Sequence, residues 1–276
     1  MTDGLSGLAG WPGTHRAAGW LAADGRAATA GEIDRSFRLA SVTKLLTATA
    51  VLVAVQEEIV HLDEPAGPPD ATVRLLLCHA SGLPFDGSKP IAAPGTRRVY
   101  GNPAFELLGE LVAERAGLPF HQYTAAAVLQ PLGMAGTDCV GSPAHGSSTT
   151  LPDLLRFADE LLHPGRVLAP ETLASAITPQ LPELAGVLPG FGRQDPNPWG
   201  LGFELHGEKA PHWMPPGSSP RTFGHFGQSG AFLWVDPDAG VACAALTYEP
   251  FGDWAATAWP ALGGEVLAAA SPTPDL

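Results

Sequence analysis

The sequence predicts an α+β fold in which one antiparallel sheet, flanked by helices, is built from the N- and C-terminal segments of the chain. Strand patterns occur near the N-terminus and return after residue 221, whereas residues 61–204 have mainly the patterns of helices and long loops. Because the strands of one sheet lie side by side, we expect the mainly helical middle to be an inserted second lobe. A cleft between the lobes is the natural place for a ligand.

The length and composition support a folded protein with a large core. The chain has 276 residues, of which 45% are hydrophobic and 16% charged. We therefore expect a sheet lobe formed by residues 1–60 and 205–276, and a helical lobe formed by residues 61–204.

The first elements are a hairpin and a buried helix. Two short apolar runs within residues 17–32 flank Asp24-Gly25, a dipeptide that suits a tight hairpin turn. Residues 42–60 are apolar on nearly every side of a helical wheel, which predicts a helix buried all round. Ser41 would then lie at the N-terminus of that helix.

Two helix starts are expected in the middle region. Asn102 followed by Pro103 is typical of an N-cap and a first helical residue, and Gly117 is a natural end for that helix. Thr150 and Asp153 resemble a capping box that opens the next amphipathic run.

The C-terminal region changes to strands and ends on a helix. Apolar runs at 232–235 and 241–247 flank a turn at 236–240, which predicts an antiparallel pair. An amphipathic pattern over 254–270 predicts a final helix, with a kink at Pro260.

Charge and targeting signals limit the function classes. With 15 basic and 28 acidic residues the net charge is −13, so nucleic acids and membrane surfaces are poor partners. Asp3 and several prolines and glycines interrupt any secretory pattern, and the apolar run 45–55 is too short to span a bilayer. Cys78, Cys139 and Cys243 are odd in number and far apart, which indicates neither a disulfide framework nor a zinc site. We expect a soluble, cytoplasmic protein.

The strongest chemical signal is the pair Ser41 and Lys44. On a helix, residues at i and i+3 share a face, so the hydroxyl and the amine can meet. Desolvation can lower the pKa of a buried lysine enough for it to activate a serine, and a helix N-terminus favours developing negative charge. The alternative for an isolated S-x-x-K is an N-cap serine with a surface lysine.

Further segments carry a family resemblance. Tyr100-Gly-Asn102 precedes a predicted helix, and His225-Phe-Gly opens the C-terminal strand region. Together with Ser41 and Lys44 they resemble the S-x-x-K, Y-x-N and K-T-G or H-x-G motifs of serine β-lactamases, penicillin-binding proteins and related carboxylesterases. The Y-x-N form is most similar to class C β-lactamases and their esterase relatives. The segments 76–84, 97–112, 131–137 and 223–240 also resemble that family, so the resemblance covers roughly residues 33–250.

The resemblance implies the catalytic roles. Ser41 would form an acyl-enzyme, while Lys44 and Tyr100 would share proton transfer, with the base left open between them. Asn102 would hydrogen-bond the substrate. A plain structural role is the alternative for each: aromatic packing for Tyr100 and a helix cap for Asn102.

It also implies a binding cleft. His225 would line the cleft, and Gly227 would let the substrate backbone approach. The backbone N–H groups of Ser41 and Gln228 would form the oxyanion hole. His225 could instead have no role, and we assign His79, which lies in another family segment, to loop structure.

The expected function is hydrolysis of a small-molecule ester or amide through acyl-Ser41, with no metal and no organic cofactor. Lactamases of this type carry lysine where this chain has His225, and Tyr248 follows Thr247 where the family often has asparagine. A histidine of ordinary pKa would be mostly neutral at pH 7 and gain charge as the pH falls. Carboxylesterase is therefore preferred. The alternatives are a β-lactamase or D-amino-acid peptidase, and a non-catalytic acyl-binding sensor. The oligomeric state is left open.

Overall fold

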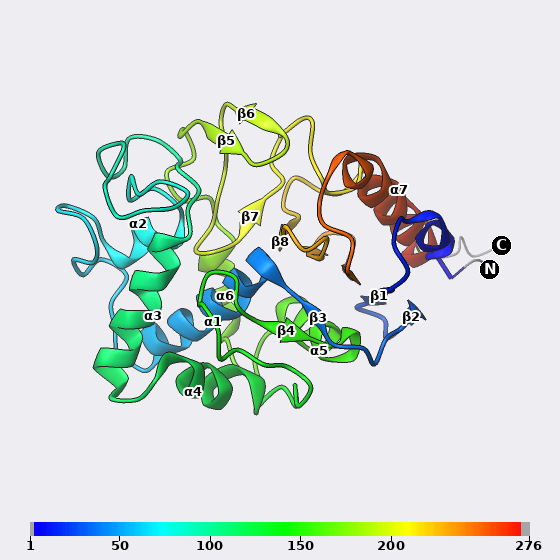
Figure 1. Cartoon of the computed structure of the whole chain (residues 1–276), viewed down its shortest axis with the longest axis horizontal. Coiled ribbons are helices and arrows are strands. Elements are labelled where there is room, and N and C mark those ends of the chain that lie inside the picture. The colour runs from blue at the N-terminus through cyan, green and yellow to red at the C-terminus, as the bar shows by residue number, and fades with distance from the viewer. Residues whose placement is uncertain (1–2, 272–276) are drawn as a thin grey trace.

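The computed structural model describes residues 3–271, which form a six-stranded antiparallel sheet with helices on both faces (Figure 1). The strand order is β2-β1-β10-β9-β8-β7, and every neighbouring pair is antiparallel. The strands are β1 (Arg16–Ala22), β2 (Ala27–Gly31), β7 (Glu204–Leu205), β8 (Phe223–Phe226), β9 (Phe232–Asp236) and β10 (Val241–Thr247). The sheet is thus built from the two ends of the chain, as predicted.

The remaining elements are mostly helical. The α-helices are α1 (Thr43–Gln56), α2 (Val73–Leu77), α3 (Pro103–Ala116), α4 (Phe120–Thr124), α5 (Leu151–Leu162), α6 (Pro170–Ala176) and α7 (Asp253–Ala270). Single turns are η1 (Ser6–Gly10), η2 (Ala40–Val42) and the π-helical η3 (Ala125–Leu129). Two small sheets pair β3 (Phe37–Arg38) with β4 (Ser148–Thr149), and β5 (Gly186–Leu188) with β6 (Gly192–Gln194).

The sheet separates two hydrophobic cores. Alternate residues of β10 enter different cores: Ala242, Ala244 and Leu246 enter one, and Val241, Cys243 and Ala245 the other. The first core includes α1, α3 and α5, and the second lies under α7 and η1. Figure 1 shows α7 at the opposite side of the molecule from α3 and α4.

Although α5 lies within 61–204, it packs on the sheet; the predicted lobe boundaries stay a prediction. None of the helices within residues 3–271 has the length and apolarity needed to cross a membrane.

Several local predictions are confirmed. The hairpin turns at Asp24, whose carboxylate accepts the Arg26 N–H at 3.0 Å, and Gly25 has the positive φ of 87° that the turn requires. Helix α3 begins at Pro103 and ends before Gly117, which adopts a left-handed φ of 71°. The strands β9 and β10 lie where they were expected.

Other details differ from the sequence predictions. Helix α1 ends at Gln56 rather than at residue 60, because the chain turns through Glu58 at a φ of 57°. The capping box was wrong: the Thr150 side chain makes no cap bond, and Asp153 instead accepts hydrogen bonds from the Gly136 N–H at 2.7 Å and the Thr137 hydroxyl at 3.0 Å. Helix α7 continues through Pro260.

Candidate active site

The nucleophile turn is tightly packed and locally strained. Ser41 lies in η2, between β3 and α1, directly after Ala40 with a positive φ of 45°. A non-glycine residue in this region stores strain, which is common at functional sites. Gly227 at the end of β8 packs against the turn, because a Cβ there would collide with the Leu39 carbonyl oxygen and lie 3.1 Å from the Ser41 nitrogen. Glycine at 227 is therefore required by packing against the nucleophile, a reason that the sequence did not reveal.

Lys44 meets three polar groups. Its Nζ lies 2.8 Å from Asn102 Oδ1, 2.9 Å from the Ala144 carbonyl oxygen and 3.4 Å from Ser41 Oγ. The ammonium group also lies 5.0 Å from the centre of the Tyr100 ring. The first turn of α1 and the start of α3 therefore bring together the predicted catalytic residues from two distant segments.

Within the described residues 3–271, no carboxylate contacts the Lys44 amine directly. The side chain is fully buried, and this burial lowers its pKa to about 7, although the more distant charges of Glu106 and Asp86 oppose the shift. A substantial fraction of Lys44 is consequently neutral near pH 7. A neutral amine has the lone pair that a general base needs.

Tyr100 is placed beside the nucleophile and kept protonated. Burial raises the pKa of its hydroxyl above the usual value near 10, while the neighbouring Ser41 side chain opposes the shift. Its ring packs 4.6 Å from the His79 ring and 5.9 Å from the Trp199 ring, centre to centre. Tyr100 is therefore a phenol rather than a phenolate at neutral pH.

Asn102 is more than a helix cap. Its side chain makes no cap bond to α3; instead Oδ1 accepts from Lys44, and Nδ2 donates to Asp86 Oδ1 at 3.1 Å. Both ends of the amide are engaged. Its predicted hydrogen bond to substrate stays a prediction.

His225 is neutral in this environment. Its Nδ1 lies 2.6 Å from the Phe226 carbonyl oxygen, which can only accept, so Nδ1 carries the proton and Nε2 presents a lone pair. Burial, with the nearby charge of Lys44, lowers the His225 pKa to about 3. The expectation that His225 titrates near neutral pH was wrong, because that expectation assumed a solvated imidazole.

Ser41 lies between two hollows of different character. One is a cavity of about 390 Å³ with largely apolar walls, to which Phe85, Leu188 and Trp199 contribute. The other is a wide groove of about 1860 Å³. Ser41 and Gln228 line both. Within residues 3–271 neither backbone N–H of these two residues donates a hydrogen bond, so both are free to serve the predicted oxyanion hole.

Comparisons with known proteins identify the family of this chain. A family model described as Beta-lactamase matches residues 10–267. The chain belongs to the β-lactamase family. The predicted family resemblance and the fold that it implies are thus confirmed.

Individual relatives of this β-lactamase-family protein differ in activity. The crystal structure of a β-lactamase from Mycobacterium bovis is 49% identical with a TM-score of 0.94, covering 97% of this chain and 99% of that one. A Pseudomonas fluorescens β-lactamase is 26% identical over 224 residues, which are 62% of this chain and 60% of that protein. The D-alanyl-D-alanine-carboxypeptidase/endopeptidase AmpH of Escherichia coli K12 is 28% identical over 149 residues, or 41% and 39% of the two chains. The alignments thus span about 60% and 39% of these two curated relatives.

A more distant likeness concerns the fold alone. Unliganded simvastatin synthase from Aspergillus terreus has a TM-score of 0.74 at 18% identity, covering 92% of this chain and 93% of that one.

Sequence reasoning missed several residues of this β-lactamase-family site. The Ala144 carbonyl that accepts from Lys44 could not be found, because every residue has a carbonyl. Asp86 and Trp199 carried no motif. His79 was assigned to loop structure; it is fully buried, at a φ of 56°, and its ring packs at a tilt of 46° against Tyr100, so it also supports the predicted catalytic tyrosine.

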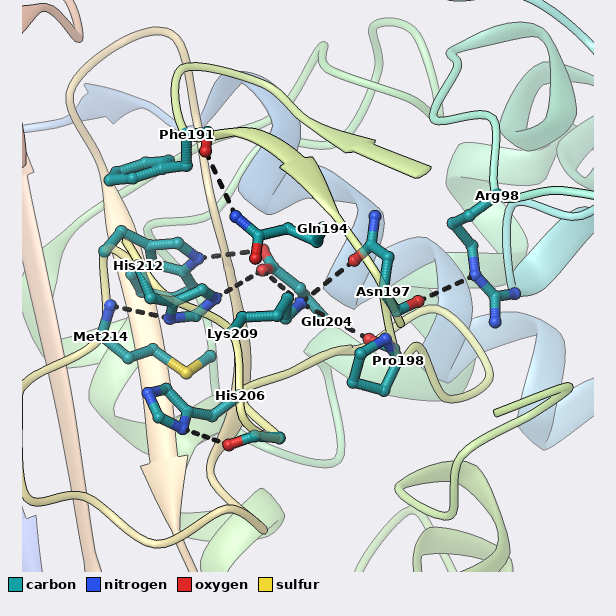
Figure 2. A network of polar contacts seen from close by, with 12 residues as sticks. Arg98, Phe191, Gln194, Asn197, Pro198, Glu204, His206, Lys209, His212 and Met214 are labelled. Carbon is teal, nitrogen blue, oxygen red and sulfur yellow. Dashed lines mark hydrogen bonds and ion pairs between the residues drawn. The ribbon is translucent and has the colours of Figure 1, made fainter. Parts of the chain in front are cut away.

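A second buried polar cluster lies behind the small cavity (Figure 2). Glu204 Oε1 accepts from Lys209 Nζ at 2.8 Å and from His212 Nε2 at 2.7 Å, and Oε2 accepts from the Trp213 indole at 2.9 Å. Burial alone would raise the Glu204 pKa, but Lys209 and His212 outweigh it and lower that pKa. Every Glu204 oxygen is satisfied, so this cluster is structural. Within residues 3–271 no group of three or more His, Cys, Asp or Glu side chains is placed to hold a metal ion.

Proposed function

We propose that this chain is a carboxylesterase that cleaves small esters through an acyl-Ser41 intermediate. The arrangement of Ser41, Lys44 and Tyr100 supports covalent catalysis by the serine. The observation that carries the preference for neutral esters is His225, which is neutral and lines the small cavity.

The reaction begins with neutral Lys44. Its lone pair takes the Ser41 proton as Ser41 Oγ attacks the ester carbonyl carbon, and the resulting oxyanion accepts hydrogen bonds from the N–H groups of Ser41 and Gln228. Tyr100 donates its proton to the leaving alcohol as the C–O bond breaks, and Lys44 returns a proton to Tyr100. Water then attacks acyl-Ser41 by the same proton route and releases the acid.

The lining of the small cavity disfavours a substrate carboxylate. Among the described residues that line it are Glu204 and neutral His225, and no lysine or arginine. A hydrogen bond to a charged group contributes about 1.5–3 kcal/mol, against roughly 1 kcal/mol for a neutral one. Lacking a cation, the cavity should therefore disfavour a carboxylated substrate by up to about thirtyfold in kcat/KM.

Hydrolysis of β-lactams or D-amino-acid peptides is the second candidate. It is supported by the names of the Mycobacterium bovis and Escherichia coli relatives, and by Arg38, a cation in the lining of the wide groove. A carboxylate placed in that groove could contact Arg38.

Parallel assays test these proposals. A fluorophosphonate should add once to the wild type and not to Ser41→Ala; an adduct on another serine contradicts the site. Turnover of a chromogenic short-chain ester but not of a chromogenic cephalosporin supports the esterase. The reverse result supports the second candidate. A lasting acyl adduct without turnover, seen by intact mass, supports a sensor.

A matched pair of esters tests the role of His225. The neutral ester should be preferred over its carboxylated counterpart by a ratio that is constant from pH 5.5 to 8.5, because His225 does not titrate there. His225→Lys should shift the ratio toward the carboxylated ester. A ratio unchanged by the substitution contradicts the assignment.

A further inference from the structure

The direction of the Lys44 lone pair is set by its two closest neighbours. A neutral amine has two N–H bonds and one lone pair. Asn102 Oδ1 at 2.8 Å and the Ala144 carbonyl at 2.9 Å can only accept hydrogen bonds, so they take the two N–H groups. The lone pair is then left for the third neighbour, Ser41 Oγ at 3.4 Å. This arrangement is the one in which the amine can remove the serine proton.

The direction of the Lys44 lone pair depends on which end of the Asn102 amide faces Lys44. If the amide were rotated by half a turn, Nδ2 would face the amine and donate to its lone pair, which would no longer be available to Ser41. Asp86 opposes that rotation: its Oδ1 accepts from Nδ2 at 3.1 Å, and a carboxylate facing the amide oxygen instead would meet acceptor with acceptor. Asp86 belongs to the loop between α2 and α3 and lines the wide groove.

We propose that Asp86 is a positioning residue that holds the Asn102 amide with its oxygen toward Lys44, and thereby keeps the Lys44 lone pair directed at Ser41. The proposal rests on the proposed function only in taking Ser41 as a nucleophile activated by Lys44. It does not depend on the substrate.

A purely electrostatic role for Asp86 must be separated from this one. Asp86 and Glu106 both favour the charged form of Lys44. Glu106, however, accepts a hydrogen bond from the Ser142 hydroxyl and has no bond to Asn102. Glu106→Gln can keep that acceptor while removing the charge, so it is the matched control. The other titratable groups that face Lys44 are Tyr100, His79 and His225, which all variants retain.

The experiment measures the rate of fluorophosphonate labelling from pH 5.5 to 9 in the wild type, Asp86→Ala, Asp86→Glu and Glu106→Gln. Loss of either carboxylate should move the acidic limb of the profile to lower pH. Only Asp86→Ala should also lower the rate at the high-pH plateau, by about ten- to a hundredfold, as expected for a misplaced catalytic group. Asp86→Glu should restore most of the plateau, because its carboxylate can still accept from Asn102.

The outcomes separate the proposals. If Asp86→Ala keeps the wild-type plateau, or matches Glu106→Gln throughout, Asp86 acts through charge alone and the positioning role is overturned. Failure of Asp86→Glu to recover any of a lost plateau also contradicts it. If the wild type is labelled but turns over no ester, the esterase proposal is contradicted, whereas the positioning role of Asp86 is still tested by the labelling rates. If the wild type is not labelled at all, both are overturned. Denaturant unfolding of each variant checks that the fold is retained.

Discussion

Lys44 and Lys209 are the lysines buried in the part of the chain that the structure describes, and they differ in whether a carboxylate contacts the amine. Lys44 Nζ contacts neutral acceptors, namely an amide oxygen, a backbone carbonyl and a serine hydroxyl. Lys209 Nζ lies 2.8 Å from the Glu204 carboxylate and makes a longer bond of 3.3 Å to Asn197 (Figure 2). Burial lowers the pKa of both, but for Lys209 the adjacent carboxylate opposes that shift directly.

The difference supports the proposed chemical role of Lys44 and a structural role for Lys209. Loss of the proton from Lys209 would leave Glu204 as an uncompensated buried charge, so the pair stays ionised. The carboxylates that act on Lys44 within residues 3–271, Glu106 and Asp86, lie farther away, and its pKa of about 7 lets it exchange protons near neutral pH. A buried lysine therefore becomes a base when its contacts are polar but uncharged.

The largest expected effect on activity comes from replacing Lys44, the buried lysine whose amine contacts neutral groups. Lys44→Met should lower kcat by about 10²–10⁴, because general base assistance is lost. Its unfolding free energy should change by about 1 kcal/mol or less, since relief of the amine's desolvation offsets two acceptors left unpaired. Steady-state kinetics and denaturant unfolding measure the two quantities. Near-wild-type activity would remove Lys44 from the mechanism.

Lys209→Met should have the opposite profile. We expect a loss of about 3–5 kcal/mol in unfolding free energy, because Glu204 is left buried without its cation. Adding Glu204→Gln should recover part of that loss, because it removes the unpaired buried charge. His212 and Trp213 donate to different Glu204 oxygens, so the single glutamine oxygen can accept from only one of them. Urea titrations of the single and double variants provide the test. If the second substitution destabilises further, the ion pair is not the source of the effect.

The pH dependence of activity should report Lys44 and not Lys209. Because the base must be neutral, kcat/KM should rise about tenfold per pH unit below pH 7 and then level off. Burial keeps Tyr100 protonated, so no alkaline decline is expected below about pH 10. A profile measured with a pH-stable ester checks this. A midpoint above pH 9 would mean that Lys44 has the pKa of an ordinary lysine.

A smaller effect concerns the histidine of the structural cluster. Burial lowers the His212 pKa to about 4, whereas an unfolded histidine titrates near 6.5. Below pH 6.5 the unfolded state takes up a proton that the native state does not. The unfolding free energy therefore decreases as the pH is lowered from about 6.5 to about 4. From pH 7.5 to 5 this should cost about 2 kcal/mol, and His212→Gln should remove that part of the pH dependence. Equal pH dependence in both proteins would show that His212 is not neutral in the native state.

The residues of the motifs could be found from the sequence because they combine local spacing with rare combinations of chemistry. Ser41 and Lys44 are one helical turn apart, and the apolar run after them predicted a buried helix that the structure confirms. The partners that tune them could not be found in this way. Asp86 and Ala144 lie 42 and 100 residues from Lys44, and neither has a side-chain pattern that marks it.

By itself the sequence determined the fold class and the sheet built from both chain ends, and it predicted the catalytic groups, because periodicity, turn residues and motif spacing are local properties. Only the tertiary structure decided their protonation. Whether Lys44 is a base, His225 a neutral acceptor and Lys209 a structural cation depends on desolvation and on which groups lie within about 3 Å, and both are set by residues far apart along the chain.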